Sequence, residues 1–465
     1  MRNILLFILL LAACTKGSAQ KPSARFFEVD TIMVEGNKKT RRPIILRELE
    51  FAPGDKIAPG KLKKSLKQSE NNLLNTELFN FVEITADTAG TLLSINIELT
   101  EQWYSWVFPY FEMVDRNFNT WWETKDFSRA DYGLLFIQEN FRGRNETLHL
   151  KMIGGHNEYL NFRYLIPYFD SKKQWGAIFE GEFLRSHETA VLTRDDELVF
   201  FNDADSYPIK KNIGKVTLSY RKKLYRRHFF SLAYKDYAFM DTLAMINPDF
   251  LMGNKSRARY FGISYEYERD FRDYISYPLK GHYLDIILEK EGLGMLDNVV
   301  DFWRFKGFFQ KYWKFSNRWY AASGLTLSFS DESKQPYFLN SGLGYNKSFV
   351  RSYEYNVING NNYGLLRSNI KFALIPTKTV NLDFIPLEQF SKLFYALYVN
   401  AFVDFGYVDS FDSWQSNGNH LPGELLMGKG IGFDLVTYYE KVFRFEYSWD
   451  KNNNGGFFIH FVAPL

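Results

Sequence analysis

The sequence predicts a sixteen-stranded antiparallel transmembrane β-barrel behind one small N-terminal α+β domain. Two observations support this fold class. The chain contains 45 phenylalanines, 30 tyrosines and 10 tryptophans, yet 24% of its 465 residues are charged and its mean hydropathy is −0.31. After residue 103, no run is long and apolar enough for a transmembrane helix. Because backbone polar groups must be satisfied inside lipid, only helices and closed barrels span membranes, and barrel strands alternate apolar and polar residues.

The N-terminus has the form of a bacterial secretory signal. Arg2 precedes a short apolar run over residues 4–13, and small residues follow. Cleavage after residues 17–19 (Gly-Ser-Ala) fits ordinary signal peptidase and would give a signal peptide over residues 1–19. The stretch 11–14 (Leu-Ala-Ala-Cys) instead resembles a lipobox and would end the signal at residue 13. Both interpretations stay open at this point, and both take the protein out of the cytoplasm.

Under the second interpretation Cys14 would be lipidated. Cys14 is also the only cysteine of the chain. A disulfide within one chain and a cysteine-based metal site are therefore excluded.

Residues 26–101 are expected to form a small domain with the order strand, helix, helix, strand, strand. The first strand ends at the Gly36-Asn37 turn, and Pro43 is well placed in the first turn of a short helix. A second helix begins near Pro59 and carries a stripe of leucines. Its members are Leu62, Leu66, Leu73 and Leu74. Two strands around Val82–Ile84 and Leu93–Ile97 complete the unit.

Residues 103–465 contain sixteen segments with a period of two, the period of a strand between lipid and water. In the segment 443–449, for example, aromatic residues alternate with Arg444, Glu446 and Ser448. The predicted strands begin near Tyr104, Tyr132, Thr147, Tyr159, Trp175, Ile213, His228, Arg259, Gly281, Phe302, Arg318, Tyr363, Tyr395, Lys429, Val442 and Gly456. Short connections such as 222–227 and 439–441 are expected on the periplasmic side. Long ones, 185–212 and 330–362, are expected outside.

Two motifs in the barrel region point to an internal contact. The long connection before Tyr363 contains Arg351, and the strand near 402–406 contains Asp404. An arginine in a loop that folds into a narrow lumen needs a carboxylate, because an unpaired buried charge is costly. Phe402 and Asp404 share one strand face, so Asp404 can point inward and form a bidentate pair with Arg351. The alternative is two unrelated charges on a solvated loop and wall.

These features together resemble the BamA/TamA outer-membrane assembly-factor superfamily, from about residue 26 to the end. Residues 26–101 resemble a single POTRA module at four stretches, namely Val34–Asn37, Ile45–Leu49, Pro53–Asp55 and Leu78–Ile84. The site residues that this resemblance implies are Val350, Arg351, Ser352 and Tyr353 in the loop and Phe402, Asp404 and Gly406 in the wall.

Two positions depart from the pattern of the family. Ser352 stands where the family usually has glycine, and a positive φ at a serine would be strained. Leu465 replaces the usual terminal phenylalanine. The resemblance also implies a lateral seam between the first and last strands, near residues 104–114 and 456–464. Gly455 and Gly456 would either weaken pairing there or form a hairpin turn, and the turn is favoured.

The resemblance implies a protein of the bacterial outer membrane with its POTRA-like domain in the periplasm. Its expected partners are unfolded outer-membrane or secreted polypeptides, outer-membrane lipids and accessory lipoproteins. The expected function is assembly or translocation of these polypeptides. A dedicated two-partner-type secretion transporter is the first alternative, and a passive porin or receptor is the second. For the POTRA-like domain, a rigid spacer is the alternative to a peptide-binding module.

Other function classes find no support in the sequence. The net charge is only +3, which argues against a nucleic-acid partner. The seven histidines are scattered without the spacing of a metal site or a catalytic triad. We therefore expect no enzymatic activity, no cofactor and no metal.

Overall fold

The computed structural model describes residues 26–113, 130–252, 255–297, 299–331, 335–345, 348–382, 392–409, 417–437 and 441–460. Within them, no helix has both the length and the apolar character needed to cross a membrane. The signal peptide, Cys14 and Leu465 lie outside the described residues, so the expectations about them stay untested.

Apart from one additional short strand, the N-terminal domain has the predicted order of elements. They are β1 (Phe27–Glu35), α2 (Arg42–Arg47), β2 (Lys56–Ile57), α3 (Pro59–Leu74), β3 (Phe79–Ala89) and β4 (Leu92–Glu101). The sheet order is β2-β1-β4-β3, with β1 and β4 parallel. Its core is mainly aliphatic, with Ile45, Leu73 and Ile95 fully buried. The leucine stripe of α3 packs into or against this core, as its helical spacing predicts.

Strand β2 is absent from the sequence prediction. It is only two residues long and pairs with Phe27 and Glu28. The chain reaches this position through a turn in which the N–H of Gly54 donates to the carbonyl of Val29 at 2.7 Å. The side chain of Ile57 is buried in the domain core, but two residues are too few to show the period of two by which a strand is recognised in a sequence.

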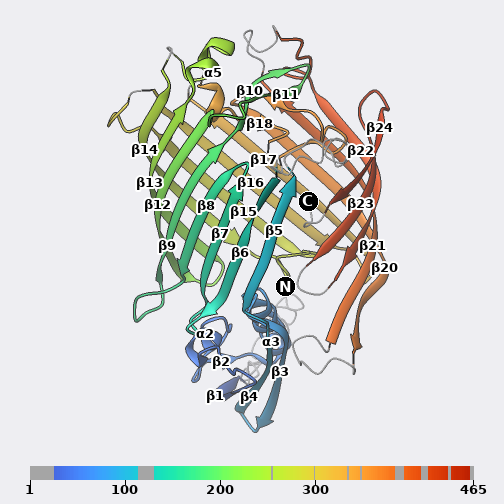
Figure 1. Cartoon of the computed structure of the whole chain (residues 1–465). Helices are drawn as coiled ribbons and strands as arrows, with labels where there is room; N and C mark the ends of the chain where they lie inside the picture. Colours follow the sequence, from blue (N-terminus) through green and yellow to red (C-terminus); the bar gives the residue numbers. More distant parts are fainter. Residues whose placement is uncertain are drawn as a thin grey trace, which may run out of the picture.

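The barrel wall is one sheet of sixteen antiparallel strands, as predicted (Figure 1). The strands are β5 (Ser105–Met113), β6 (Ala130–Phe141), β7 (Glu146–Gly155), β8 (Glu158–Ile166), β9 (Trp175–Ser186), β12 (Ile209–Lys223), β13 (Arg226–Phe239), β14 (Arg257–Asp270), β15 (Gly281–Glu291), β16 (Phe302–Lys314), β17 (Trp319–Ser330), β20 (Tyr363–Asn381), β21 (Lys392–Val408), β22 (Leu426–Val436), β23 (Val442–Trp449) and β24 (Gly455–His460). Each predicted start falls within a few residues of the observed one.

The two faces of the wall differ as the alternation predicts. Val216, Leu232 and Ile263 are register neighbours on three adjacent strands, and all three are exposed on the outer face. One residue away from Val216, Lys215 forms an ion pair with Glu180 at 3.4 Å on the other face. The outer face is therefore an apolar band suited to lipid, and the inner face is charged.

The two ends of the barrel carry different structures (Figure 1). The N-terminal domain lies at the end where the strand connections are short. At the other end lie the hairpin of β10 (Glu188–Arg194) and β11 (Glu197–Asn202) and the short helix α5 (Asp241–Ile246). This arrangement agrees with the expectation that short connections face one side and long ones the other.

The sheet ends at β5 on one side and at β24 on the other. The prediction of a hairpin turn at Gly455 and Gly456 is wrong, because both glycines belong to β24 and pair with Trp449 and Ser448. The turn lies just before them, where Asp450 accepts hydrogen bonds from the N–H groups of residues 452 and 454 at 2.8 Å. The Asp450 side chain provides the turn, so the glycines are free to pair.

Candidate functional site in the barrel lumen

The long connection between β17 and β20 folds back against the inside of the wall. We call its described residues 340–345 and 348–362 the inner loop. Two short strands, β18 (Gly342–Leu343) and β19 (Ile358–Asn359), pair antiparallel within it. Val350 is fully buried and lies in one apolar cluster with Leu365 of β20. The inner loop is thus packed against the wall rather than solvated.

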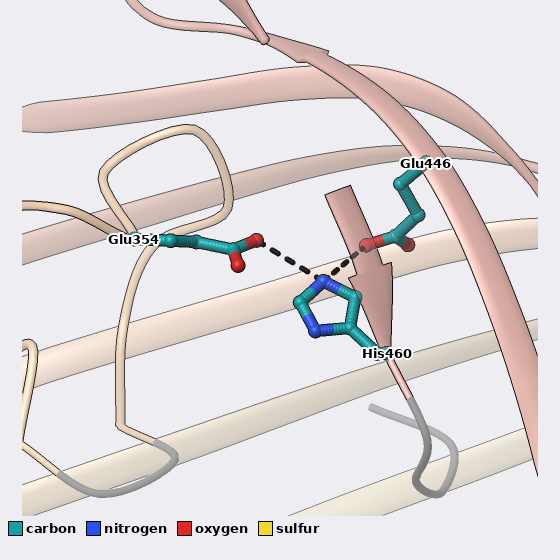
Figure 2. A group of neighbouring side chains, drawn as sticks. All are labelled: Glu354, Glu446 and His460. Carbon is teal, nitrogen blue, oxygen red and sulfur yellow. Dashed lines mark ion pairs between the residues drawn. The ribbon is translucent and has the colours of Figure 1, made fainter. Parts of the chain in front are cut away.

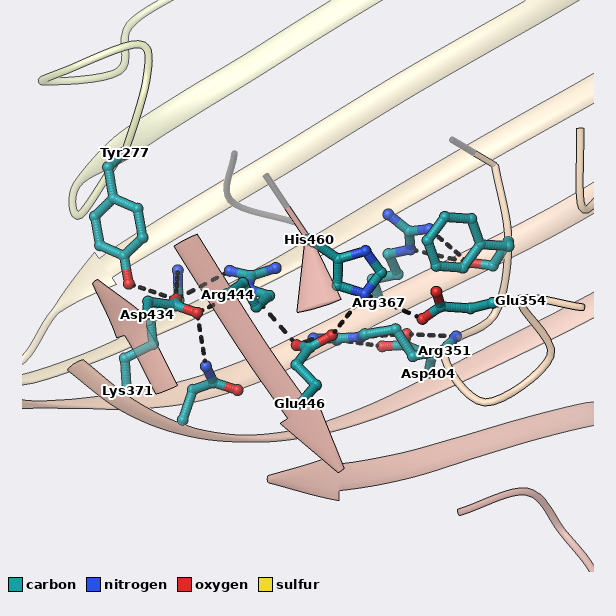
Figure 3. A network of polar contacts seen from close by, with 12 residues as sticks. Tyr277, Arg351, Glu354, Arg367, Lys371, Asp404, Asp434, Arg444, Glu446 and His460 are labelled. Carbon is teal, nitrogen blue, oxygen red and sulfur yellow. Dashed lines mark hydrogen bonds and ion pairs between the residues drawn. The ribbon is translucent and has the colours of Figure 1, made fainter. Parts of the chain in front are cut away.

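Arg351 of the inner loop and Asp404 of β21 form the predicted ion pair (Figure 3). Nε of Arg351 lies 2.7 Å from Oδ2 and Nη2 lies 2.6 Å from Oδ1, which is a bidentate geometry. The backbone N–H of Arg351 also donates to Oδ2 at 3.3 Å. Both side chains are buried. The alternative of two unrelated solvated charges is therefore wrong.

The wall residues two positions before and after Asp404 also contact the inner loop. The guanidinium carbon of Arg351 lies 3.6 Å from the centroid of the Phe402 ring, a cation–π contact. A Cβ at Gly406 would come within 2.4 Å of Cγ2 of Val350. The three predicted wall residues therefore supply a ring, a carboxylate and a gap beneath the inner loop.

Strand β22 supplies a second gap, which sequence reasoning missed. Gly428, Gly430 and Gly432 occupy alternate positions on its buried face. A Cβ at Gly428 would lie 1.9 Å from the carbonyl oxygen of Arg351, and one at Gly430 would lie 2.5 Å from Phe402. The signal was present as a glycine at every second residue of a strand, which indicates close approach of another chain segment.

The ion pair belongs to a longer polar network (Figure 3). Nη1 of Arg351 lies 3.1 Å from Oε1 of Glu446 on β23. The neighbouring Arg444 holds Asp434 of β22 through Nε at 2.7 Å and Nη2 at 3.0 Å. The hydroxyl of Tyr277 donates to Asp434 at 2.6 Å. Arg444 and Glu446 occupy alternate positions of the predicted strand, but no local pattern indicates which charges they meet.

Two cations of β20 complete the network. Nη2 of Arg367 donates to the carbonyl of Phe349 at 2.5 Å, which adds a second contact between wall and inner loop. Nζ of Lys371 lies 3.8 Å from Asp434 and 4.2 Å from the ring centroid of Tyr277. Buried charges at this density are tolerated only where each has partners of the opposite sign or hydrogen bonds.

The turn of the predicted loop motif carries backbone strain. The N–H of Tyr353 donates to the carbonyl of Val350 at 3.0 Å, so residues 350–353 form a β-turn. Ser352 occupies the third position of this turn with a φ of 86°, which is the positive φ expected to be strained at a serine. Turns of this kind favour glycine at that position, because Cβ disfavours positive φ.

The network reaches the last strand through His460, the final described residue of β24. Nε2 of His460 lies 3.1 Å from Oε1 of Glu354 in the inner loop and 3.5 Å from Oε2 of Glu446 (Figure 2). Sequence reasoning missed this group of three, since its members are scattered along the chain.

Comparison with known proteins places this architecture in a family. Residues 27–102 match the POTRA family model, described as surface antigen variable number repeat, and residues 140–459 match the Omp85 superfamily domain. The chain belongs to the Omp85 superfamily. No curated protein sequence matches it.

Two solved structures share the Omp85 fold. BamA from Haemophilus ducreyi lacking POTRA domains 1–3 is 15% identical with a TM-score of 0.50, and the match covers 94% of this chain and 83% of that one. CdiB from Escherichia coli is 11% identical with a TM-score of 0.54, and coverage is 93% and 75%. These similarities support the fold of this chain, a barrel preceded by the POTRA domain of residues 27–102.

The POTRA domain of this Omp85 chain docks on the short-turn end of the barrel. Glu48, directly after α2, is buried and receives both Arg221 nitrogens, Nη1 at 2.8 Å and Nη2 at 2.7 Å. Nε of Arg47 donates to the carbonyl of Lys173 at 2.9 Å. Burial alone would raise the pKa of Glu48, but the attraction and hydrogen bonds of Arg221 outweigh it and lower the pKa below its usual value.

Proposed function

We propose that this Omp85 protein is an outer-membrane factor that assembles or translocates polypeptide clients. In this proposal the barrel lies in the bacterial outer membrane and the POTRA domain lies in the periplasm. The clients are unfolded outer-membrane or secreted polypeptides. Outer-membrane lipids and accessory lipoproteins are further proposed partners. Membership of the Omp85 superfamily and the matched POTRA domain support this assignment.

The observation that carries the proposal is the pair of strand edges at the ends of the sheet. β24 pairs with β23, and β5 pairs with β6. Within the described residues, no ladder joins β24 to β5. An edge presents N–H and C=O groups that an incoming strand can use. The work is then an exchange of hydrogen bonds, and we infer that the protein catalyses no bond chemistry.

The inner loop favours this function over a passive porin. A porin conducts through a water-filled lumen. Here Val350 and Arg351 are buried against the wall, and Arg351 is held by two carboxylates. A loop held so firmly across the inner face narrows the path that a diffusing solute would take.

Depletion of the protein in its host, followed by quantification of all outer-membrane proteins, tests the proposal. Broad loss of β-barrels is the expected result for a general assembly factor. Loss of one exported protein would assign the chain to dedicated two-partner-type secretion. An unchanged outer-membrane and secreted proteome would contradict both.

A further inference from the structure

We propose that Glu354, Glu446 and His460 form a binding site for a divalent transition metal of the zinc class, and that the bound ion ties the last strand of the barrel to the inner loop. The three residues come from three separate segments. Glu354 belongs to the inner loop, Glu446 to β23 and His460 to β24, and their side chains converge on one point (Figure 2).

The spacing of the donor atoms suits a tetrahedral ion. Donors about 2.0–2.1 Å from zinc lie roughly 3.3–3.4 Å from one another. Nε2 of His460 lies 3.1 Å from Glu354 and 3.5 Å from Glu446, and all three donor atoms fall within 4.8 Å. An ion can therefore enter with small side-chain adjustments and without movement of the backbone.

Two of the donor atoms are buried without a hydrogen bond. Oε1 of Glu354 and Nε2 of His460 are shielded from solvent, and neither has a hydrogen-bond partner in the described structure. They face each other at 3.1 Å, but they are not aligned as donor and acceptor. Buried polar atoms normally have a hydrogen-bond partner, and two neighbouring buried atoms without one call for an explanation. A shared cation satisfies the lone pairs of both atoms at once.

The third donor is already oriented by its neighbours. Oε1 of Glu446 faces Arg351 at 3.1 Å and Arg444 at 3.6 Å, while Oε2 turns toward His460. A metal-bound carboxylate typically has its second oxygen hydrogen-bonded in this way. Each arginine also holds a bidentate carboxylate of its own, Asp404 or Asp434. Glu446 therefore keeps negative charge for an ion.

The donor types indicate the class of metal. One imidazole and two carboxylates suit zinc and similar divalent ions, whereas calcium and magnesium prefer oxygen donors throughout. Three protein ligands leave one tetrahedral position for water or for a group of another molecule. The cluster thus differs from the neighbouring arginine–carboxylate pairs, which hold no vacant position.

The location gives the ion a structural consequence that rests on the proposed function. His460 ends the described part of β24, one of the two strand edges. A bound ion would couple this edge to the inner loop and so to the wall through Arg351. Without the ion, the described part of β24 would keep only its short pairing to β23 and two ring contacts with the inner loop, Phe349 with His460 and Tyr355 with Phe458. Metal would then regulate how readily the edge becomes available to a client strand.

Calorimetric titration of zinc into the purified full chain in detergent, first stripped with a chelator, tests the site. The expected result is one saturable site per chain. Glu354→Gln and His460→Ala are each expected to weaken zinc binding by on the order of 100-fold. His228→Ala is the matched control, because His228 lies on β13, where its Nδ1 is 2.9 Å from the Tyr265 hydroxyl. The zinc affinity of this variant should equal that of the wild type.

Hydrogen exchange provides a second measurement on the same samples. Zinc should slow exchange in residues 442–460 of the wild type and of His228→Ala, but not of Glu354→Gln. Heat-modifiable migration in electrophoresis checks that each variant is folded. Equal zinc affinity in the wild type and both site variants would overturn the site. The site would also be overturned if exchange in residues 442–460 slowed with a change of pH but not with zinc. That result would assign the cluster to ion pairs between His460 and the two glutamates.

The two proposals fail separately. Zinc binding at this cluster in a protein whose depletion changes no client would leave the site in place and overturn the function. Normal client assembly by a chain that binds no zinc would overturn the site alone.

Discussion

At the residue scale, a single guanidinium connects the inner loop to three side chains of the barrel wall. Arg351 contacts the carboxylate of Asp404, the ring of Phe402 and the carboxylate of Glu446. Only arginine can make all three contacts together, since its planar fork binds a carboxylate bidentately and stacks on a ring. The inner loop is thus attached to β21 and β23 through one side chain.

Replacement of Arg351 should therefore free the inner loop. We expect Arg351→Ala to destabilise the loop by about 3–5 kcal/mol, because Asp404 is left as an unpaired buried charge. Limited proteolysis of the inner loop and client assembly in cells would measure the effect. Arg185→Ala is a suitable control, because both side chains of its pair with Glu158 are exposed and the pair should contribute little. Wild-type protease resistance and activity in Arg351→Ala would contradict this role.

Ser352 should gain stability from the residue that the family usually has. Its φ of 86° is costly for any residue with a Cβ, and its hydroxyl is buried without a hydrogen bond. We expect Ser352→Gly to raise the free energy of unfolding by about 0.5–1 kcal/mol, after the loss from a more flexible unfolded chain. Denaturant titration measures this difference.

Ser352→Ala separates the two causes, since alanine removes the hydroxyl but keeps the backbone strain. A gain in Ser352→Ala equal to that in Ser352→Gly would assign the effect to the hydroxyl. A loss of stability in Ser352→Gly would show that the turn is not strained.

At the element scale, β22 makes room for the inner loop because three positions on its buried face have no side chain. Its buried face presents glycines at 428, 430 and 432, and then Asp434. The missing side chains make room for the inner loop and for Phe402, while Asp434 anchors Arg444. A strand with this many glycines pairs through its backbone yet packs weakly by itself. The loop supplies the packing that the strand cannot.

A methyl group at Gly428 should therefore displace the inner loop. Its Cβ would lie 1.9 Å from the backbone oxygen of Arg351, which no side-chain rotation can relieve. We expect Gly428→Ala to lower stability by about 1–3 kcal/mol and to expose the loop to protease. In the control Gly181→Ala nothing lies within 4 Å of the added Cβ, so little change is expected. Equal behaviour of the two variants would refute close packing at Gly428.

At the scale of the whole molecule, the POTRA domain and the barrel are joined by buried charge. Glu48 and Arg221 are separated by 173 positions and meet in a bidentate pair. Asn75 adds a second contact, since its Oδ1 accepts the N–H of Ile275 at 3.0 Å. Further hydrogen bonds cross the junction, among them those of Asn72 with Tyr225 and of Asn140 with Thr40. The buried ion pair is thus the charged centre of a larger set of polar contacts.

Acid should loosen this junction. Because the pKa of Glu48 is lower when folded than its usual 4.5, its stabilising contribution is complete above that value and is lost as the pH falls through the folded pKa. Distances between spin labels on the POTRA domain and a barrel turn should broaden at low pH. Glu48→Gln should show the broad distribution already at neutral pH, whereas Glu28→Gln, exposed on β1, should behave as wild type. A distribution that does not change with pH would contradict this role of Glu48.

The sequence by itself determined the sixteen strands, the POTRA domain and the Arg351–Asp404 pair. Strand alternation is a local pattern that each segment carries, and the pair was found because its two motifs resemble those of a known family. The tertiary structure alone decided that the inner loop fills the gap at Gly428. It alone also brought together the Glu48 junction and the cluster of Glu354, Glu446 and His460. These contacts join residues far apart in the chain, and their meeting depends on strand register and on how the inner loop lies in the barrel. No local period of side chains encodes either.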